Sequence, residues 1–158
     1  MAYQSNNKPS GYDRQGSTNS GWQASNAYAI AFKGTPTVKD DYVDEAEKVI
    51  LAIKDDRNGR NLTTTKLRNL LSLTADLYNQ AERCSQEDLP TEITGKIDYL
   101  RIRFAYEAGR TPEVKCLVET ANLLEKLKSI QNKKTNFIRF SRYMEALVAF
   151  HRYHGGKD

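Results

Sequence analysis

From residue 41 onward, apolar side chains recur at the three- and four-residue spacing of an α-helix, and no segment alternates with the period of a strand. Turn residues interrupt this pattern at Gly59, at Pro90 and at Gly155. The pattern predicts helices over about residues 41–54, 63–83, 91–109, 112–130 and 135–154. The expected fold is therefore all-α, a compact five-helix bundle.

Two of these helices carry more specific expectations. The third has one apolar stripe that includes Ile97 and Phe104, and a second, nearly opposite, formed by Tyr99, Ile102 and Tyr106. A helix that is apolar on two sides is usually central in a bundle. The third helix is also expected to end at Gly109, a typical residue after a helix C-terminus. The polar face of the fourth helix is expected to reach solvent through Lys115, Glu119, Asn122 and Lys126.

Residues 1–38 have a different composition. Twenty-one of these 38 residues are Gly, Pro, Ser, Thr, Asn or Gln, and they show no helical period. Such a segment buries too little apolar surface to offset the entropy lost on ordering. We therefore predict a flexible polar tail over 1–38 and a helical domain over 39–158. The spaced aromatic residues of the tail could stack on bases or dock on a neighbouring subunit, or serve neither purpose.

The charge distribution is uneven. The whole chain has a net charge of +4, but residues 96–158 hold thirteen cationic and seven anionic side chains, whereas residues 39–95 have a net charge of −4. This asymmetry favours a polyanionic partner. The mean hydropathy is −0.71 and no apolar run reaches the roughly 20 residues of a membrane span. Together with the absence of a secretory signal pattern, this predicts a cytoplasmic protein without membrane contact.

The residues needed for catalysis or metal binding are scarce. Only two histidines and two cysteines occur, and no phosphate-loop, dinucleotide-binding or zinc-protease motif is present. His151 and Cys116 border apolar helix faces, which favours packing roles, and acid pairs such as Asp55–Asp56 fall at helix ends. We therefore expect no catalytic residue, no metal site and no cofactor.

Cationic side chains, by contrast, form runs that lack acids. No acid lies between Asp56 and Asp76 or between Glu125 and Glu145, although both stretches contain several Lys and Arg residues. Cations without nearby carboxylates can hold phosphates, and free amides at the start of the second helix would add to this attraction. An ordinary solvated basic face is the open alternative. The candidate RNA-binding residues are Lys66, Arg68, Arg101, Arg103, Arg110, Lys133, Lys134, Arg139 and Arg142.

Three ordered blocks carry a family resemblance. They are LTTTKLRNLL at 62–71, YLRIRFAYEAGR at 99–110 and FSRYMEALVAFH at 140–151, the last closing with GGKD at 155–158. Together they resemble the small helical subunit of type III-A CRISPR–Cas (Csm) effector complexes, over roughly residues 40–158. The resemblance implies a non-catalytic subunit of an antiviral defence complex. It would stack in several copies beside the backbone and large subunits and stabilise paired guide RNA and target RNA.

Base pairing reads the sequence in such complexes, so the subunit would need only sequence-independent phosphate contacts. Two other classes of protein remain open from the sequence. One is a helical protein-binding adaptor without direct RNA contact, and the other is a small metal-dependent nuclease.

Overall fold

A computed structural model describes residues 32–158 of the chain. Within this range the chain is helical, with two isolated bridges and no sheet, which confirms the all-α class. The described helices are α1 (Tyr42–Asp55), the short 3₁₀ helix η1 (Gly59–Asn61), α2 (Thr64–Glu82), α3 (Thr91–Arg110), α4 (Pro112–Thr120), α5 (Leu123–Ser129) and α6 (Lys134–Tyr153).

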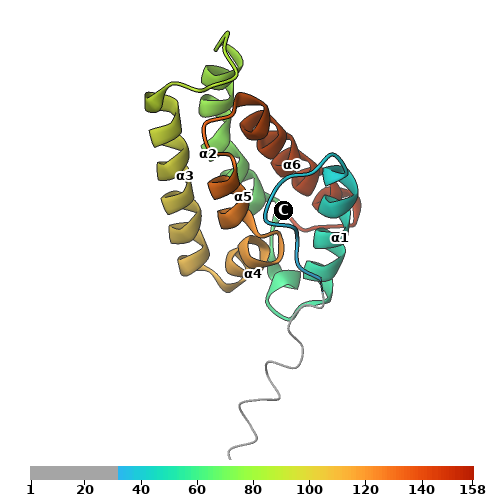
Figure 1. Cartoon of the computed structure of the whole chain (residues 1–158). Helices are drawn as coiled ribbons and strands as arrows, with labels where there is room; N and C mark the ends of the chain where they lie inside the picture. Colours follow the sequence, from blue (N-terminus) through green and yellow to red (C-terminus); the bar gives the residue numbers. More distant parts are fainter. Residues whose placement is uncertain (1–31) are drawn as a thin grey trace, which may run out of the picture.

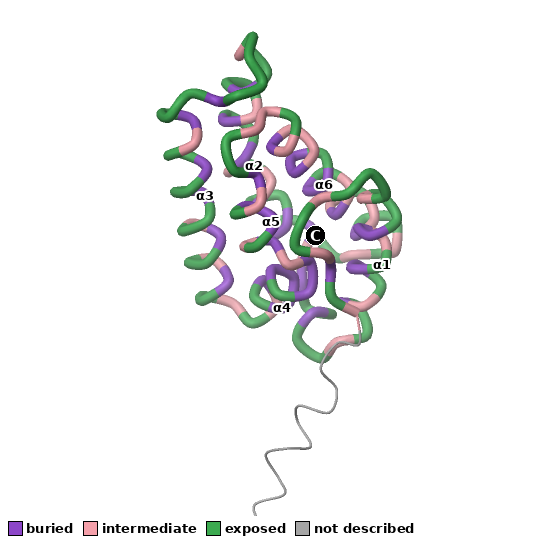
Figure 2. The backbone as a smooth tube through the Cα atoms, in the orientation of Figure 1, coloured by how far each residue is buried: buried purple, intermediate pink, exposed green. Residues whose placement is uncertain are grey.

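The helices are arranged with α2 between α3 and α6, and α1 on the outer side of α6 (Figure 1). Helices α4 and α5 pack across this layer and contact α3. Figure 2 shows that the buried residues of each helix face the interior that these elements enclose. The largest fully buried side chains include Phe104, Phe140 and Tyr143, and burying an apolar side chain of this size contributes about 1.5–3 kcal/mol.

The predicted fourth helix is two helices, α4 and α5, separated at Ala121 and Asn122. Asn122 adopts the left-handed conformation, with φ of 55°, which asparagine tolerates better than most residues. The amide of Gly34 donates to the carbonyl of Thr120 at 2.6 Å, and the Asn122 side chain donates to the Gly34 carbonyl at 3.3 Å. The expected five helices are therefore six α-helices among residues 32–158, because a segment far away in sequence stabilises the break.

The same break corrects the predicted polar face. Lys126 does not reach solvent: it is fully buried, and its ammonium lies 2.6 Å from a carboxylate oxygen of Glu45. The left-handed conformation of Asn122 interrupts the helix, so the periodicity of one continuous helix no longer holds beyond this residue. Lys115 and Glu119, on α4, are exposed as predicted.

Helix α3 also differs from its predicted position. It lies at the edge of the bundle (Figure 1), and Tyr99, Ile102 and Tyr106 are 58–62% exposed. Its other stripe, which includes Ile97 and Phe104, packs into the core. The helix continues through Gly109 and ends at Arg110. It ends there because the next residue, Thr111, precedes Pro112 and has the extended conformation that proline favours in the residue before it.

The end of the predicted tail that the structure describes lies against the bundle. Phe32 and Val38 are partly buried against the core, and the Thr35 hydroxyl donates to Glu45 at 2.7 Å. Lys126 donates to the Thr35 carbonyl. Residues 1–31 of the predicted tail lie outside the described residues. Residues 32–38 therefore form an arm that contacts α1, α5 and the turn between α4 and α5.

Candidate nucleic-acid interface

A groove between α2 and α3 gathers three of the predicted RNA-binding residues. Lys66 comes from the start of α2, and Arg103 and Arg110 come from the second half of α3. The groove has a volume of about 400 Å³ and continues into a second hollow of about 200 Å³, with which it shares Leu73 and Arg103. The two hollows thus follow the facing sides of α2 and α3 over several turns.

The N-terminus of α2 is less open to anions than the sequence suggests. The Thr63 hydroxyl accepts from the Lys66 amide at 3.2 Å, as a helix cap does. The amide of Thr64, expected to be free, donates to the carbonyl of Lys157 at 2.6 Å. The C-terminal segment of the chain therefore satisfies one of the amides expected to attract a phosphate.

The cations of this groove differ in their partners. Lys66 is paired with Glu113, and this bond lowers the pKa of the Glu113 carboxyl below its ordinary value. Arg110 lies 3.5 Å from Glu107 and over the ring of Tyr106. Arg103 has no ion pair with any described residue, and its buried Nε has no hydrogen-bond partner in this part of the chain. Arg103 is thus the groove cation with the most free hydrogen-bonding capacity.

Three other predicted contacts lie away from the groove and are engaged. Lys133 pairs with Asp88 at 2.5 Å, and Lys134 donates to the carbonyls of Glu82 and Cys84 at 2.9 and 2.7 Å. Arg139 pairs with Asp40 at 3.0 Å. The expectation that gaps in the acids leave these cations free is wrong for Lys66, Lys133 and Arg139, because folding brings acids from distant segments to them.

The remaining predicted contacts are exposed. Arg68 on α2, Arg101 on α3 and Arg142 on α6 are solvent-accessible, and none forms an ion pair with a residue in the described range. The prediction that these six arginines and three lysines bind RNA stays a prediction, with Arg68, Arg101, Arg103 and Arg142 the least engaged within the protein.

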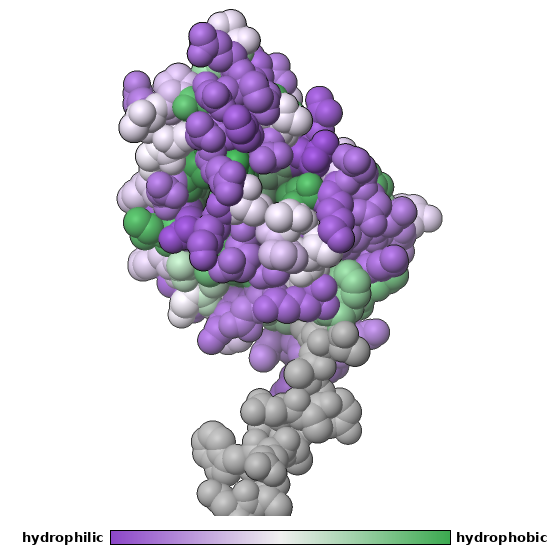
Figure 3. Space-filling model, viewed as in Figure 1, coloured by the Kyte–Doolittle hydropathy of each residue, from purple (hydrophilic) through white to green (hydrophobic). Residues whose placement is uncertain are grey.

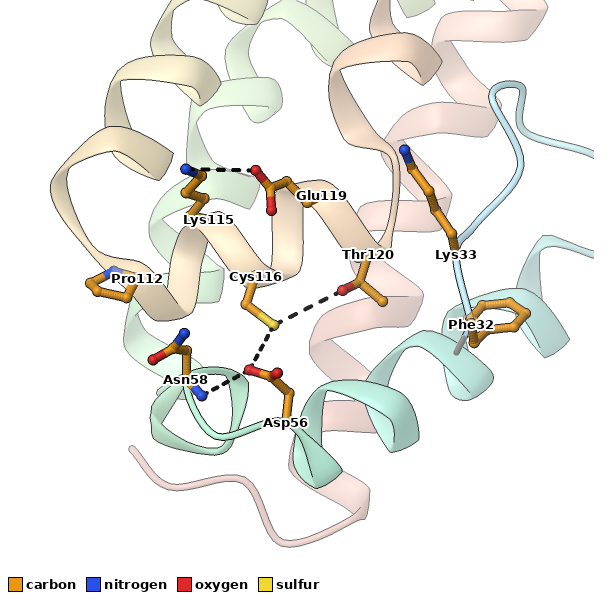
Figure 4. A pocket seen from close by; sticks show the side chains of 9 residues that line it. All are labelled: Phe32, Lys33, Asp56, Asn58, Pro112, Lys115, Cys116, Glu119 and Thr120. Atoms are coloured by element: carbon orange, nitrogen blue, oxygen red, sulfur yellow. Dashed lines mark hydrogen bonds and ion pairs between the residues drawn. The ribbon is translucent and has the colours of Figure 1, made fainter. Parts of the chain in front are cut away.

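Another hollow, of about 600 Å³, is lined by Asp56, Cys116 and Lys33 among others (Figure 4). In this view Lys115 and Glu119 point toward one another, and the thiol of Cys116 lies between Asp56 and Thr120. Burial, together with the neighbouring Asp56 carboxylate, raises the pKa of the Cys116 thiol to about 12. The thiol is therefore protonated at neutral pH and is a poor nucleophile.

The histidine expected to pack does so. His151 is 3% exposed, with its Nε2 3.1 Å from the Leu62 carbonyl and its Nδ1 3.1 Å from the Thr64 hydroxyl. Burial lowers the pKa of His151, which favours the neutral ring. No cluster of three His, Cys, Asp or Glu side chains suited to a metal occurs among residues 32–158. None of the helices in this range is long and apolar enough to cross a membrane.

Two features of the structure were not predicted from the sequence. One is the buried pair of Lys126 and Glu45, for which local periodicity gives no signal. The other is the exposed stripe of Tyr99, Ile102 and Tyr106. Figure 3 shows a largely hydrophilic face with several small hydrophobic areas, one of them at the edge where α3 lies. The stripe was recognised as apolar, but its exposure could not be read from its period.

Comparison with known proteins gives consistent matches. A model of the Csm2 type III-A family matches residues 38–157. The Csm2 protein of the Mycobacterium tuberculosis CRISPR system is 46% identical over 121 residues, which cover 77% of this chain and 97% of the relative. The Streptococcus thermophilus Csm2 protein is 45% identical over 120 residues, covering 75% and 95% of the two chains.

The Enterococcus italicus Csm2 protein is 33% identical over 111 residues, covering 65% of this chain and 79% of the relative. These matches confirm the resemblance found in the three sequence blocks. They establish that this chain belongs to the Csm2 family, whose members are subunits of type III-A CRISPR–Cas complexes.

Proposed function

We propose that this Csm2-family subunit is a non-catalytic RNA-binding component of its complex. It stabilises the duplex of guide RNA and target RNA through sequence-independent phosphate contacts. Further copies of the chain stack beside the backbone and large subunits, in the cytoplasm, as part of antiviral defence. Base pairing supplies the sequence specificity in this arrangement, so the subunit needs positive charge rather than base-reading side chains.

One observation carries the proposal. Three neighbouring helices, α2, α3 and α6, each hold at least one arginine that has no ion pair within the described range: Arg68, Arg103 and Arg142. Surface cations in proteins are commonly near carboxylates, whereas a guanidinium without an ion pair can offer donors to a phosphate. Helix α2 lies between the other two, so these charges belong to adjacent elements.

The proposal of a non-catalytic role rests on the state of the candidate nucleophile and base. The Cys116 thiol is held protonated, and both ring nitrogens of His151 are occupied by Leu62 and Thr64. The Cys116 thiol is bonded to Asp56 in the turn after α1, and His151 is bonded to two buried residues. These contacts support packing roles for both residues.

A salt titration tests the RNA-binding proposal. The full-length chain is titrated with short RNA duplexes of two unrelated sequences at several salt concentrations. If about five phosphates are contacted, the logarithm of the binding constant should fall with log salt with a slope of about −3.5 to −4.5. The two sequences should bind alike. A flat salt response or a strong sequence preference would contradict the proposal.

A matched pair of variants locates the contacts. Arg68→Ala combined with Arg142→Ala should weaken duplex binding and reduce the magnitude of the salt slope by about 2, because two phosphate contacts are lost. Lys115→Ala on α4, which also removes an exposed cation, should leave the slope unchanged.

A protein-binding adaptor is the second candidate, and the exposed apolar stripe on α3 favours it. Tyr99, Ile102 and Tyr106 lie on one side of that helix and are all more than half exposed. An adaptor would show no salt-dependent RNA binding, while Ile102→Ser would weaken its association with the other subunits of the complex.

A further inference from the structure

Helix α3 presents two tyrosines to solvent beside the cationic groove, and this pairing of aromatic rings with arginines is the basis of the inference. We propose that the groove between α2 and α3 holds unpaired RNA, with a base stacked on Tyr99 and the neighbouring phosphates on Arg103 and Arg110. The inference rests on the proposed RNA-binding function and adds unpaired RNA to the duplex as a ligand of the subunit. It assigns single-stranded nucleotides, and with them Arg103, to this groove, and leaves the duplex backbone to Arg68 and Arg142.

The apolar end of the groove has the composition of a base-binding surface. Tyr99 lines the hollow of about 200 Å³ together with Leu73, Leu77 and Leu100. The tyrosine is 58% exposed, so its ring is available to a ligand, while Leu77 and Leu100 are buried and form the floor. Stacking of a base on an aromatic side chain is tolerant of sequence, because every base has a π-face.

The other end of the groove has the composition of a phosphate-binding surface. Lys66, Arg103 and Arg110 line the hollow of about 400 Å³, and Arg103 belongs to both hollows. Arg103 follows Tyr99 by one helical turn, about 6 Å along the axis of α3. A base on Tyr99 therefore leaves its own backbone near the guanidinium of Arg103, which forms no ion pair with a described residue.

A second aromatic and cationic pair repeats this arrangement. Tyr106 lies seven residues after Tyr99, on the same side of α3, and is 59% exposed. The guanidinium of Arg110 lies over its ring, 5.6 Å from the centroid. Two rings spaced about 10 Å apart along one helix, each followed by an arginine four residues later, suit a strand that runs along α3.

The polar residues at the apolar end add contacts for a base edge. Asp76 and Gln80 come from α2 and Lys96 from α3, and the Lys96 ammonium donates to the Gln80 side-chain oxygen at 2.8 Å. These groups can exchange that bond for hydrogen bonds to a base. In an RNA duplex the bases are stacked inside the helix, so only unpaired or splayed nucleotides could reach Tyr99.

The alternative occupant is another protein, and Ile102 would suit it. Charge favours RNA, because four cations, Lys66, Lys96, Arg103 and Arg110, line the two hollows against two acids, Asp76 and Glu107. A protein segment that covered the stripe would leave Arg103 unpaired unless it supplied a carboxylate at that position. The experiment must therefore separate the two classes of partner.

The test uses the full-length chain and two probes of equal length, a labelled oligouridylate single strand and the same strand paired with oligoadenylate. Tyr99→Ala should lower the affinity for the single strand about tenfold, since stacking on one aromatic side chain is worth a factor of this order. Duplex affinity should not change. Tyr99→Phe should keep wild-type binding of both probes, because it keeps the ring.

Tyr153→Ala is the matched control, since Tyr153 is 79% exposed but lies at the end of α6, and it should alter neither affinity. A third probe, an abasic strand of the same length, should bind the wild-type and Tyr99→Ala chains equally.

Several outcomes would overturn the inference. Equal loss on the single strand and the duplex, or no loss on either, would exclude base stacking at Tyr99. If Tyr99→Ala left RNA binding intact but prevented association with other subunits, the stripe would be a protein interface. If Arg68→Ala with Arg142→Ala weakened duplex binding while Tyr99→Ala had no effect, the proposed function would stand and this inference would fall. The absence of any salt-dependent RNA binding would contradict both the proposed function and this inference.

Discussion

The ammonium of Lys126 lies 2.6 Å from the carboxylate of Glu45, although 81 positions separate the two residues and neither is more than 7% exposed. The ammonium also lies 4.9 Å from the centre of the Tyr143 ring and donates to the Thr35 carbonyl. One buried lysine thus connects α1, α5, α6 and the arm. Such a pair costs desolvation on both sides, so its effect shows mainly when one partner is lost.

Removing one partner of this pair should destabilise the domain strongly. Lys126→Met leaves the Glu45 carboxylate buried without its cation, and a loss of about 3–5 kcal/mol in the free energy of unfolding is expected. Urea unfolding followed by circular dichroism measures it. Lys128→Met, at an exposed lysine two positions away, is the control and should change stability little. The combined variant Glu45→Met and Lys126→Met should be more stable than Lys126→Met alone.

The helices could be predicted from the sequence because their signals are local. Apolar spacing places the ends of α1, α2 and α6 within one residue of the observed ends. Gly59 was expected in a turn, and the structure shows why glycine is needed: a Cβ there would lie 2.4 Å from the Ile53 carbonyl oxygen. Each of these features depends on residues a few positions apart.

The interface could not be predicted to the same extent, because its features depend on distant segments. Lys66 meets Glu113 and Lys133 meets Asp88, each more than forty residues away in sequence, so an acid-free run did not identify free cations. The break at Asn122 depends on Gly34, while the apolar spacing continues through it. The two apolar stripes of α3 are alike in sequence, and only packing decides which of them is exposed.

The arm should contribute to stability. A chain of residues 32–158 should unfold cooperatively at nearly the temperature of the full chain, whereas residues 39–158 should still unfold cooperatively but at a lower temperature. Removing residues 32–38 removes two hydrogen bonds, the one that Lys126 donates to the Thr35 carbonyl and the one that the Thr35 hydroxyl donates to Glu45. Loss of such bonds to buried charged groups costs about 1.5–3 kcal/mol each. Scanning calorimetry of the three chains measures the difference.

A chain of 39–158 that melted at the temperature of the full chain would show that the arm contributes nothing. A chain of 39–158 that unfolded without a cooperative transition would show that residues 32–38 are part of the domain core. Thr35→Val in the full chain is a finer variant, because it removes only the hydroxyl that Glu45 accepts from.

The buried histidine should make stability depend on pH. Burial lowers the pKa of His151 in the folded chain below its unfolded value of about 6.5, so the unfolded chain binds the proton more tightly. The stabilising contribution is therefore complete above about pH 6.5 and is lost as the pH falls through the folded pKa. Unfolding free energies measured at several pH values from neutral to mildly acidic should show this decline, and His151→Gln should flatten it in this window.

The subunit should have no catalytic part in the activity of its complex. Cys116→Ala removes the buried thiol, and as a small core change it should cost about 1–3 kcal/mol of stability without affecting target cleavage. His151→Gln and Cys84→Ser should behave in the same way. Each variant is assembled into the complex, RNA loading and assembly are confirmed, and target cleavage is then measured at saturating target RNA.

Cleavage in these complexes should fall only in proportion to any loss of RNA occupancy. The reason is that the Cys116 thiol stays protonated beside Asp56, and that both ring nitrogens of His151 are bonded to groups of the core. Neither side chain is therefore poised to attack a phosphate or to move its proton. If a single one of these substitutions abolished cleavage in a fully assembled and RNA-loaded complex, the subunit would have to be regarded as part of an active site.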